Sequence, residues 1–215
     1  MLTEERVQHH FDRYAQRFDA IYRESEGPLS RFIDRVWRGV VLERFDLTLR
    51  KLEPLADKAV LDVGCGSGRY CIACAERGAT RVVGVDFAPA MIEIADDLSR
   101  RDGLRTRCEF RLGPFPEAVP EDSFDVSIAQ GVLDYVEDPV RILKAMREKT
   151  RSTMILSFPK SAEWRVLVRR VRFLLAGCPL FLYSERRARE ILAQAGIDRY
   201  EWIPLDRDYI VVARL

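Results

Sequence analysis

The sequence predicts an α/β fold with a doubly wound, mostly parallel sheet. Short apolar segments alternate with helical segments after residue 52, and a glycine-rich turn joins the first apolar segment to a helix. The last two apolar segments are separated only by Asp206-Arg207-Asp208. Parallel strands need helical crossovers, whereas so short a connection forms a hairpin. The sheet is therefore expected to be parallel except for an antiparallel hairpin at its C-terminal end.

Two helices are expected before the alternating part. Apolar residues recur at helical spacing between residues 4 and 24, and Glu26-Gly27-Pro28 ends this first helix. A second amphipathic helix is expected from Leu29 to about Leu52. We interpret residues 1–52 as an N-terminal helical cap and residues 53–215 as the sheet with its crossovers, both within one structural domain.

The alternating part predicts seven strands and their connecting helices. The strands are expected near 59–63, 81–85, 106–112, 124–129, 153–158, 199–205 and 209–214. The helices are expected near 69–77, 89–100, 138–147 and 184–195. Gly78 stands where the first of these helices would end, as glycine commonly does.

The segment VLDVGCGSG predicts a nucleoside-binding turn between a strand and a helix. Gly64, Gly66 and Gly68 allow a tight turn in which backbone N–H groups and the helix dipole face a ligand. Asp86 ends the next strand, where a carboxylate accepts hydrogen bonds from a ribose diol. An alternative role for Asp86 is to cap the helix that begins near Pro89.

The spacing of the glycines argues against a dinucleotide. A dinucleotide fingerprint has the pattern Gly-x-Gly-x-x-Gly, and its third glycine would fall at position 69, which is Arg69. No Gly-Lys-Ser/Thr sequence follows the turn, so a phosphate-binding Walker loop is also absent from this segment.

At these residues the chain resembles the class I S-adenosylmethionine-dependent methyltransferases. Their first motif is similar to VLDVGCGSG and their second strand to VVGVDFAPAMIEIA, and the resemblance extends from Leu52 onward. It implies a Rossmann-like seven-stranded sheet, with residues 53–215 as the methyltransferase domain. It also implies S-adenosylmethionine as cofactor and S-adenosylhomocysteine as product. The cofactor contacts expected on this basis are Asp62, Gly64, Cys65, Gly66, Gly68, Asp86, Phe87, Met91, Phe115 and Gln130.

These contacts have different expected roles. Phe87 and Met91 would sandwich the adenine, and Gln130 would face the methionine moiety. Many relatives have an aspartate where this chain has Pro114, so backbone groups near Phe115 are expected to take its place. The alternatives are that Phe87 and Met91 belong to the core, and that Gln130 is a loop residue without a ligand. Asp62 has an alternative role in tying down the glycine loop.

The catalytic residue is left open. A sulfonium methyl is already electrophilic, so a general base is needed only when the acceptor is protonated at neutral pH. The two histidines, His9 and His10, both lie on the first helix, which by resemblance covers the cofactor as a lid. His10, Tyr14 and Tyr135 are candidates, and surface exposure or packing is the alternative for each.

The segment 160–178 has no place in the crossover pattern. Apolar side chains beginning at Trp164 fall on one helical face, and Arg165, Arg169 and Arg172 fall on another. Three interpretations remain: a helix packed on the edge of the sheet, a lid over the substrate, or a contact with a membrane surface or an anion.

Composition indicates which partners and which cellular location to expect for this protein. A net charge of +1 in 215 residues does not favour nucleic acid as partner. No segment is apolar for the roughly 18 residues that a membrane span needs, and the first residues do not resemble a signal peptide. The five cysteines indicate reduced thiols and a cytoplasmic location. Cys71 and Cys74 form a C-x-x-C, which we interpret as small helix residues, and we expect no metal site.

The sequence thus predicts a methyltransferase acting on an O, N or C atom of a small-molecule acceptor. The pattern of segments is most similar to enzymes that methylate isoprenoid quinones or tetrapyrrole intermediates. One alternative is a methyltransferase of RNA or protein, although the fourth strand ends in Gln130-Gly131-Val132-Leu133 without the Asn/Asp-Pro-Pro-Tyr/Phe motif for planar nitrogen. The other alternative is a non-catalytic S-adenosylmethionine-binding protein. The oligomeric state is not predicted.

Overall fold

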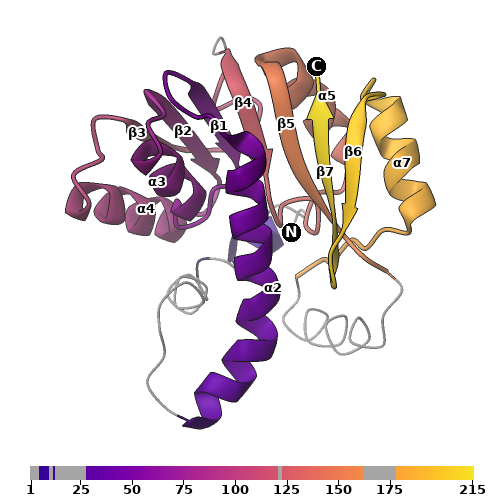
Figure 1. The fold of residues 1–215 in the computed structure, drawn as a ribbon, viewed down its shortest axis with the longest axis horizontal. Coiled ribbons are helices and arrows are strands. Elements are labelled where there is room, and N and C mark those ends of the chain that lie inside the picture. The colour runs from indigo at the N-terminus through magenta and orange to yellow at the C-terminus, as the bar shows by residue number, and fades with distance from the viewer. Residues whose placement is uncertain (1–4, 10–11, 13–27, 121–122, 162–177) are drawn as a thin grey trace.

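The computed structural model describes residues 5–9, 12, 28–120, 123–161 and 178–215 (Figure 1). This part of the chain forms a seven-stranded sheet in the order β3-β2-β1-β4-β5-β7-β6. The strands are β1 Ala59–Val63, β2 Arg81–Asp86, β3 Cys108–Leu112, β4 Phe124–Ala129, β5 Thr150–Pro159, β6 Tyr200–Pro204 and β7 Asp208–Arg214. The first five strands pair in parallel, whereas β7 lies between β5 and β6 and is antiparallel to both. The predicted fold class is confirmed.

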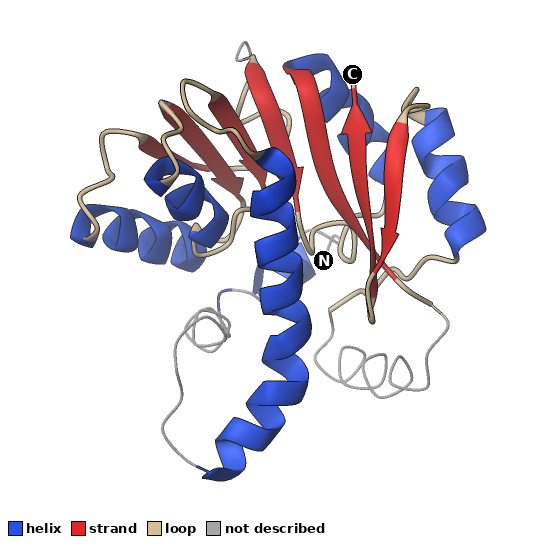
Figure 2. Ribbon diagram, in the orientation of Figure 1, coloured by secondary structure: helices blue, strands red, loops and turns tan. Residues whose placement is uncertain are grey.

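Helices cover both faces of the sheet (Figure 2). They are α2 Pro28–Leu52, α3 Arg69–Glu76, α4 Pro89–Arg101, α5 Pro139–Lys149 and α7 Glu185–Gln194. Apolar residues of α2, α3 and α4 share one core cluster with one face of the strands. Residues of α5 and α7 form a second cluster on the other face. The chain therefore has the three-layer arrangement that a doubly wound sheet requires.

Two strands begin two or more residues away from the predicted positions. β3 begins at Cys108 rather than 106, because the N–H of Arg107 donates to the carbonyl of Leu104 at 2.9 Å and closes a turn. β5 begins at Thr150 rather than 153, and Thr150 pairs with Phe124 next to an irregularity in the register. Short polar residues at strand ends leave such boundaries open in the sequence.

The last turns of α2 are part of the core. Leu49 and Leu52 are buried in the cluster on the α3 face, and Phe45 packs against it. The N-terminal half of α2 extends past the carboxyl ends of the strands (Figure 1). The division of the chain at residue 52 stays a prediction. Most of the first expected helix and of the segment 160–178 lies outside the described residues, although residues 5–9 are helical.

None of the helices in the described ranges combines the length and the apolar character that crossing a bilayer requires.

Candidate active site

A cleft opens at the carboxyl ends of β1, β2 and β4, where doubly wound sheets bind their ligands. Its volume is about 790 Å³, including the part open to solvent. Eight residues predicted from the sequence line it: Gly64, Cys65, Gly66, Asp86, Phe87, Met91, Gln130 and Tyr135. The sheet thus brings together residues from three separate loops, as the strand order allows.

The glycine loop is tied to the neighbouring strand by backbone hydrogen bonds. The N–H groups of Gly64 and Cys65 donate to the carbonyl of Val85 at 2.8 and 3.0 Å. Gly66 has a φ of +52°, and a Cβ added there would meet nothing nearer than Met91 Sδ at 4.0 Å. A side chain at position 66 would therefore enter the cleft, so the glycine keeps this space open for a ligand.

Gly68 has a packing role and does not line the cleft. A Cβ at this position would lie 2.8 Å from the ring of Phe110 and 2.9 Å from the Cβ of Ala95. Its N–H donates to the carbonyl of Cys65 within the loop. Gly68 thus lets the start of α3 approach β3 and α4 closely. The expected cofactor contact of Gly68 stays a prediction.

Asp86 joins two loops at the wall of the cleft. Its Oδ2 accepts from the N–H of Gly66 and its Oδ1 from the N–H of Ala88, both at 2.9 Å. Burial raises the pKa of this carboxyl group above its ordinary value, although these N–H groups oppose the rise. The N-cap position of α4 is Ala88, so Asp86 is not the cap residue itself.

Gln130 follows β4 and is 8% exposed. Neither atom of its side-chain amide has a hydrogen-bond partner among the residues that the structure describes. A buried polar group without a partner costs about 1–3 kcal/mol. Because Gln130 lines the cleft, a ligand with polar groups at this end would recover that cost.

Asp62 lies behind the glycine loop rather than in the cleft. It is 1% exposed, and its Oδ2 accepts a hydrogen bond from Cys71 Sγ at 3.4 Å. Desolvation raises the pKa of Asp62 to about 7, against the opposing hydrogen bond from Cys71. The loop N–H groups described above go to Val85 and Asp86 instead. The expected cofactor contact of Asp62 stays a prediction, and the loop N–H groups named above are bound by other residues.

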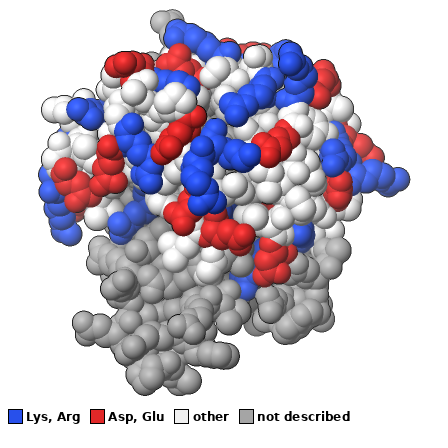
Figure 3. All heavy atoms as spheres, viewed as in Figure 1, with Lys and Arg blue, Asp and Glu red and all other residues white. Residues whose placement is uncertain are grey.

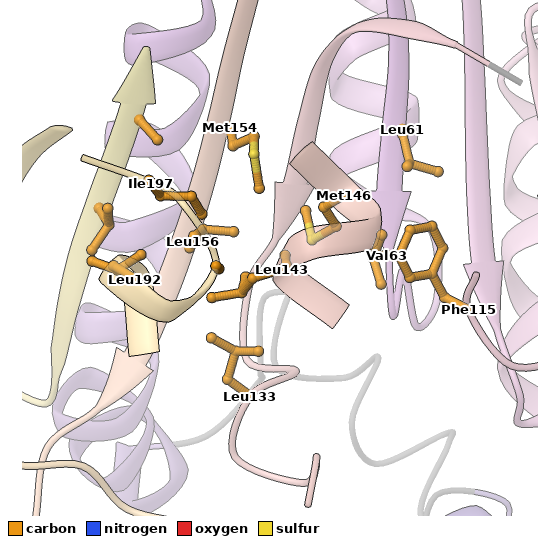
Figure 4. Packing of buried hydrophobic residues seen from close by; sticks show 14 of the residues in the cluster. Leu61, Val63, Phe115, Leu133, Leu143, Met146, Met154, Leu156, Leu192 and Ile197 are labelled. Carbon is orange, nitrogen blue, oxygen red and sulfur yellow. The ribbon is translucent and has the colours of Figure 1, made fainter. Parts of the chain in front are cut away.

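The side chain of Phe115 belongs to the hydrophobic core. It is 7% exposed and lies beside Val63 in the cluster on the α5 face (Figure 4). It is not among the described residues that line the cleft. The expected backbone contact near Phe115 stays a prediction.

The N-terminal helix contacts the mouth of the cleft. Val7 is 1% exposed and packs in a small cluster with Phe87, Tyr135 and Cys178. His9 is exposed. His10 and Tyr14 lie outside the described residues, so of the three catalytic candidates the structure places only Tyr135, at the cleft wall.

The sequence analysis missed Arg44, which also lines the cleft. This residue lies on α2, and its Nη1 donates to Asp208 Oδ2 at 2.9 Å. The periodicity of α2 indicates a helix, but it does not indicate which turn meets the end of the sheet. No signal in the sequence links position 44 to position 208.

C-x-x-C residues Cys71 and Cys74 are both fully buried in the cluster on the α3 face. Among the residues that the structure describes, no three His, Cys, Asp or Glu side chains gather as metal ligands would.

Comparison with known proteins agrees with the fold and the glycine loop. Residues 55–198 match the family model described as a methyltransferase domain. Magnesium-protoporphyrin O-methyltransferase from Rhodobacter capsulatus is 32% identical over 160 residues, which are 73% of this chain and 70% of that protein. The crystal structure of magnesium protoporphyrin IX methyltransferase from Synechocystis with bound S-adenosylhomocysteine has a TM-score of 0.77 at 21% identity, covering 97% of each chain.

A second kind of relative matches a shorter segment. tRNA U34 carboxymethyltransferase from Shewanella baltica is 32% identical over 120 residues, which are 56% of this chain. The matched part is 36% of that protein, so the chain spans about a third of its length.

This chain belongs to the methyltransferase-domain family and is a class I S-adenosylmethionine-dependent methyltransferase. Two observations show that the cleft suits S-adenosylmethionine, the cofactor of this class. Gly66 leaves space where any side chain would intrude, and the amide of Gln130 needs polar partners at the far end.

Proposed function

We propose that this methyltransferase acts on a small-molecule acceptor that binds at the mouth of the cleft. The observation that supports this most is the apolar wall beside the glycine loop, formed by Val7, Val132, Tyr135 and Val136. A wall of this kind suits a largely apolar molecule, and its burial would exclude water from the transfer.

Residues at the two ends of the cleft would hold the cofactor. Asp86 keeps carboxylate lone pairs beyond those that accept the two N–H groups, and these suit a ribose diol. Met91 and Phe87 line the same end and would pack against the adenine. Gln130 would face the amino-acid part.

The chemistry requires little beyond positioning. When bound, S-adenosylmethionine supplies an electrophilic methyl group on its sulfonium. Holding the acceptor atom in line with this group in a dry cleft accounts for a large share of catalysis. No histidine lines the cleft in the part of the chain that the structure describes. An acceptor that is already ionised, such as a carboxylate, fits this setting because no proton has to be removed.

The acceptor class to test first is a tetrapyrrole carboxylate. The Rhodobacter relative carries magnesium-protoporphyrin in its name and is similar over most of both chains. A large planar molecule with a carboxylate has the apolar body and the ionised oxygen that the cleft mouth suits. An O-methyl ester would be the product.

A macromolecular acceptor is supported less. The tRNA-modifying relatives match a shorter segment. On the face seen in Figure 3, Lys and Arg are interspersed with Asp and Glu, and those of the described residues form no continuous basic surface there. A nucleic-acid site normally concentrates positive charge.

The test is a transfer assay with methyl-labelled S-adenosylmethionine and three separate acceptors: magnesium protoporphyrin IX, a phenolic quinone precursor and total tRNA. We expect label in the first, with a mass gain of one CH₂. Label in tRNA alone would contradict the proposal. If the protein binds S-adenosylhomocysteine but transfers label to none of the three acceptors, the result would favour the non-catalytic alternative.

Asp86→Ala serves as the matched variant in this assay. Loss of a charge-assisted hydrogen bond should weaken cofactor binding by about 1.5–3 kcal/mol, or roughly 10- to 150-fold. Calorimetry with S-adenosylhomocysteine measures this directly. A folded variant with unchanged affinity would mean that another group holds the ribose.

A further inference from the structure

We propose that Arg44, oriented by Asp208, binds the α-carboxylate of the cofactor. The inference depends on S-adenosylmethionine being the cofactor and is independent of the acceptor. Arg44 lines the cleft and comes from a helix outside the crossover pattern. Its guanidinium lies beside Gly131 after β4, whereas Asp86 ends β2 on the other side of β1.

The position of Arg44 is fixed from two sides. Its Nη1 donates to Asp208 Oδ2 at 2.9 Å, and the two side chains are only 13% and 7% exposed. A Cβ added to Gly131 would lie 3.4 Å from Arg44 Nη2. The guanidinium therefore lies over Gly131, directly after the end of β4, and the missing side chain at this position gives it room.

The order of the strands sets the direction of the ligand. β2, β1 and β4 are neighbours in the sheet, with Asp86 after β2, the glycine loop after β1, and Gln130 and Gly131 after β4. S-adenosylmethionine has a ribose diol near one end and an amino acid at the other. With the diol at Asp86, the amino acid extends across the glycine loop toward Gln130 and Arg44.

The chemistry at this end matches an α-amino acid. Gln130 presents an amide oxygen and an amide nitrogen, neither of which has a partner among the described residues. These atoms suit the ammonium and the carboxylate, respectively. A guanidinium adds a planar set of donors that matches a carboxylate. Asp208 is a positioning residue, because its carboxylate accepts a hydrogen bond from Arg44 Nη1 and orients the guanidinium over Gly131.

The experiment compares two ligands by calorimetry on the full chain. S-adenosylhomocysteine carries the amino acid, whereas 5′-methylthioadenosine has the same adenosine and thioether without it. Arg44→Met should lower the affinity for S-adenosylhomocysteine at least about 10-fold and leave 5′-methylthioadenosine within about twofold. Arg44→Lys should recover part of the loss. Arg50→Met, an exposed arginine on the same helix, should change neither affinity.

A double variant controls for the possibility that Arg44→Met fails to fold. Arg44→Met leaves the buried Asp208 without its ion pair, so Arg44→Met/Asp208→Asn removes both charges. It should show the same selective loss. Asp208→Asn alone should reduce the preference for S-adenosylhomocysteine by a smaller factor.

Three outcomes would overturn the proposal. Equal losses for both ligands would mean that Arg44 only maintains the structure. If Arg69→Met, and not Arg44→Met, selectively loses affinity for S-adenosylhomocysteine, the carboxylate binds to Arg69, the other arginine that lines the cleft. Unchanged affinity of Arg44→Met for S-adenosylhomocysteine, with a raised KM for a carboxylate acceptor, would place the acceptor there. A failure to methylate any tested acceptor leaves these binding results unaffected.

Discussion

At the scale of single residues, two acids at the carboxyl ends of adjacent strands have different environments. Asp86 lies at the cleft wall and accepts hydrogen bonds from two backbone N–H groups. Asp62 is 1% exposed behind the glycine loop, next to the thiol of Cys71. Both acids were expected to contact the cofactor, and of the two only Asp86 lines the cleft. Because burial raises the pKa of Asp62, we expect its protonation to affect the stability of the fold.

We expect the Asp62→Asn variant to remove part of the pH dependence of stability. The pKa of Asp62 is raised from 3.8 to about 7 in the folded protein. Between these values the folded state binds more protons than the unfolded state, so the free energy of unfolding falls as the pH rises. From pH 4.5 to pH 8, wild type should lose about 1–4 kcal/mol relative to the variant.

Urea denaturation of both proteins across this pH range measures the difference. Asp86 is electrostatically coupled to Asp62, so the difference between the two proteins includes this coupling as well as the titration of Asp62 itself. Parallel stability profiles would show that Asp62 is ionised in the folded protein and that its burial has been compensated in another way.

At the scale of elements, two ion pairs join α2 to the C-terminal hairpin. Arg44 pairs with Asp208 of β7, and Lys51 Nζ lies 2.8 Å from a carboxylate oxygen of Glu201 in β6. The Lys51–Glu201 pair is largely exposed and contributes little to stability. The apolar side of the same turns is buried against α3. The end of α2 is therefore held mainly by packing.

We expect Leu49→Ala to destabilise the protein by about 2–4 kcal/mol. Leu49 is 1% exposed in the cluster on the α3 face, so truncation leaves a cavity. Leu42→Ala on the same helix is the matched control, because Leu42 is 40% exposed and its loss should change stability by less than about 0.5 kcal/mol. Equal effects in denaturation experiments would mean that the end of α2 is not part of the cooperative core.

At the scale of the whole molecule, the cleft draws on elements far apart in the sequence. Its wall includes Val7 from the N-terminal helix, Arg44 from α2 and the loops after β1, β2 and β4. Binding of the cofactor product should therefore stabilise the fold as a whole. NAD should not stabilise the fold in this way, because Arg69 stands where a dinucleotide site needs its third glycine.

We expect S-adenosylhomocysteine at 100 times its Kd to raise the unfolding free energy by about 2.7 kcal/mol. For a domain of this size the corresponding rise in Tm is about 5–10 °C. Differential scanning fluorimetry with S-adenosylhomocysteine and NAD in parallel measures it. An equal rise with NAD would contradict the argument from the glycine spacing.

The sequence by itself determined the order and type of the elements, because hydrophobic periodicity and turn residues act over short distances. It also determined the glycine loop and Asp86, since a parallel sheet brings successive strand ends to one edge. The residues Phe87, Met91 and Gln130 were expected from the resemblance to methyltransferases, and all three line the cleft.

Only the tertiary structure decided which side chains face the cleft. It placed Phe115 in the core, Asp62 behind the loop and Gly68 in a packing contact. It also joined Arg44 to Asp208, which are 164 positions apart. These outcomes depend on how a helix rotates against the sheet and on where β7 enters between β5 and β6. The rotation of the helices and the position of β7 come from packing across the whole domain, and no local pattern in the sequence specifies them.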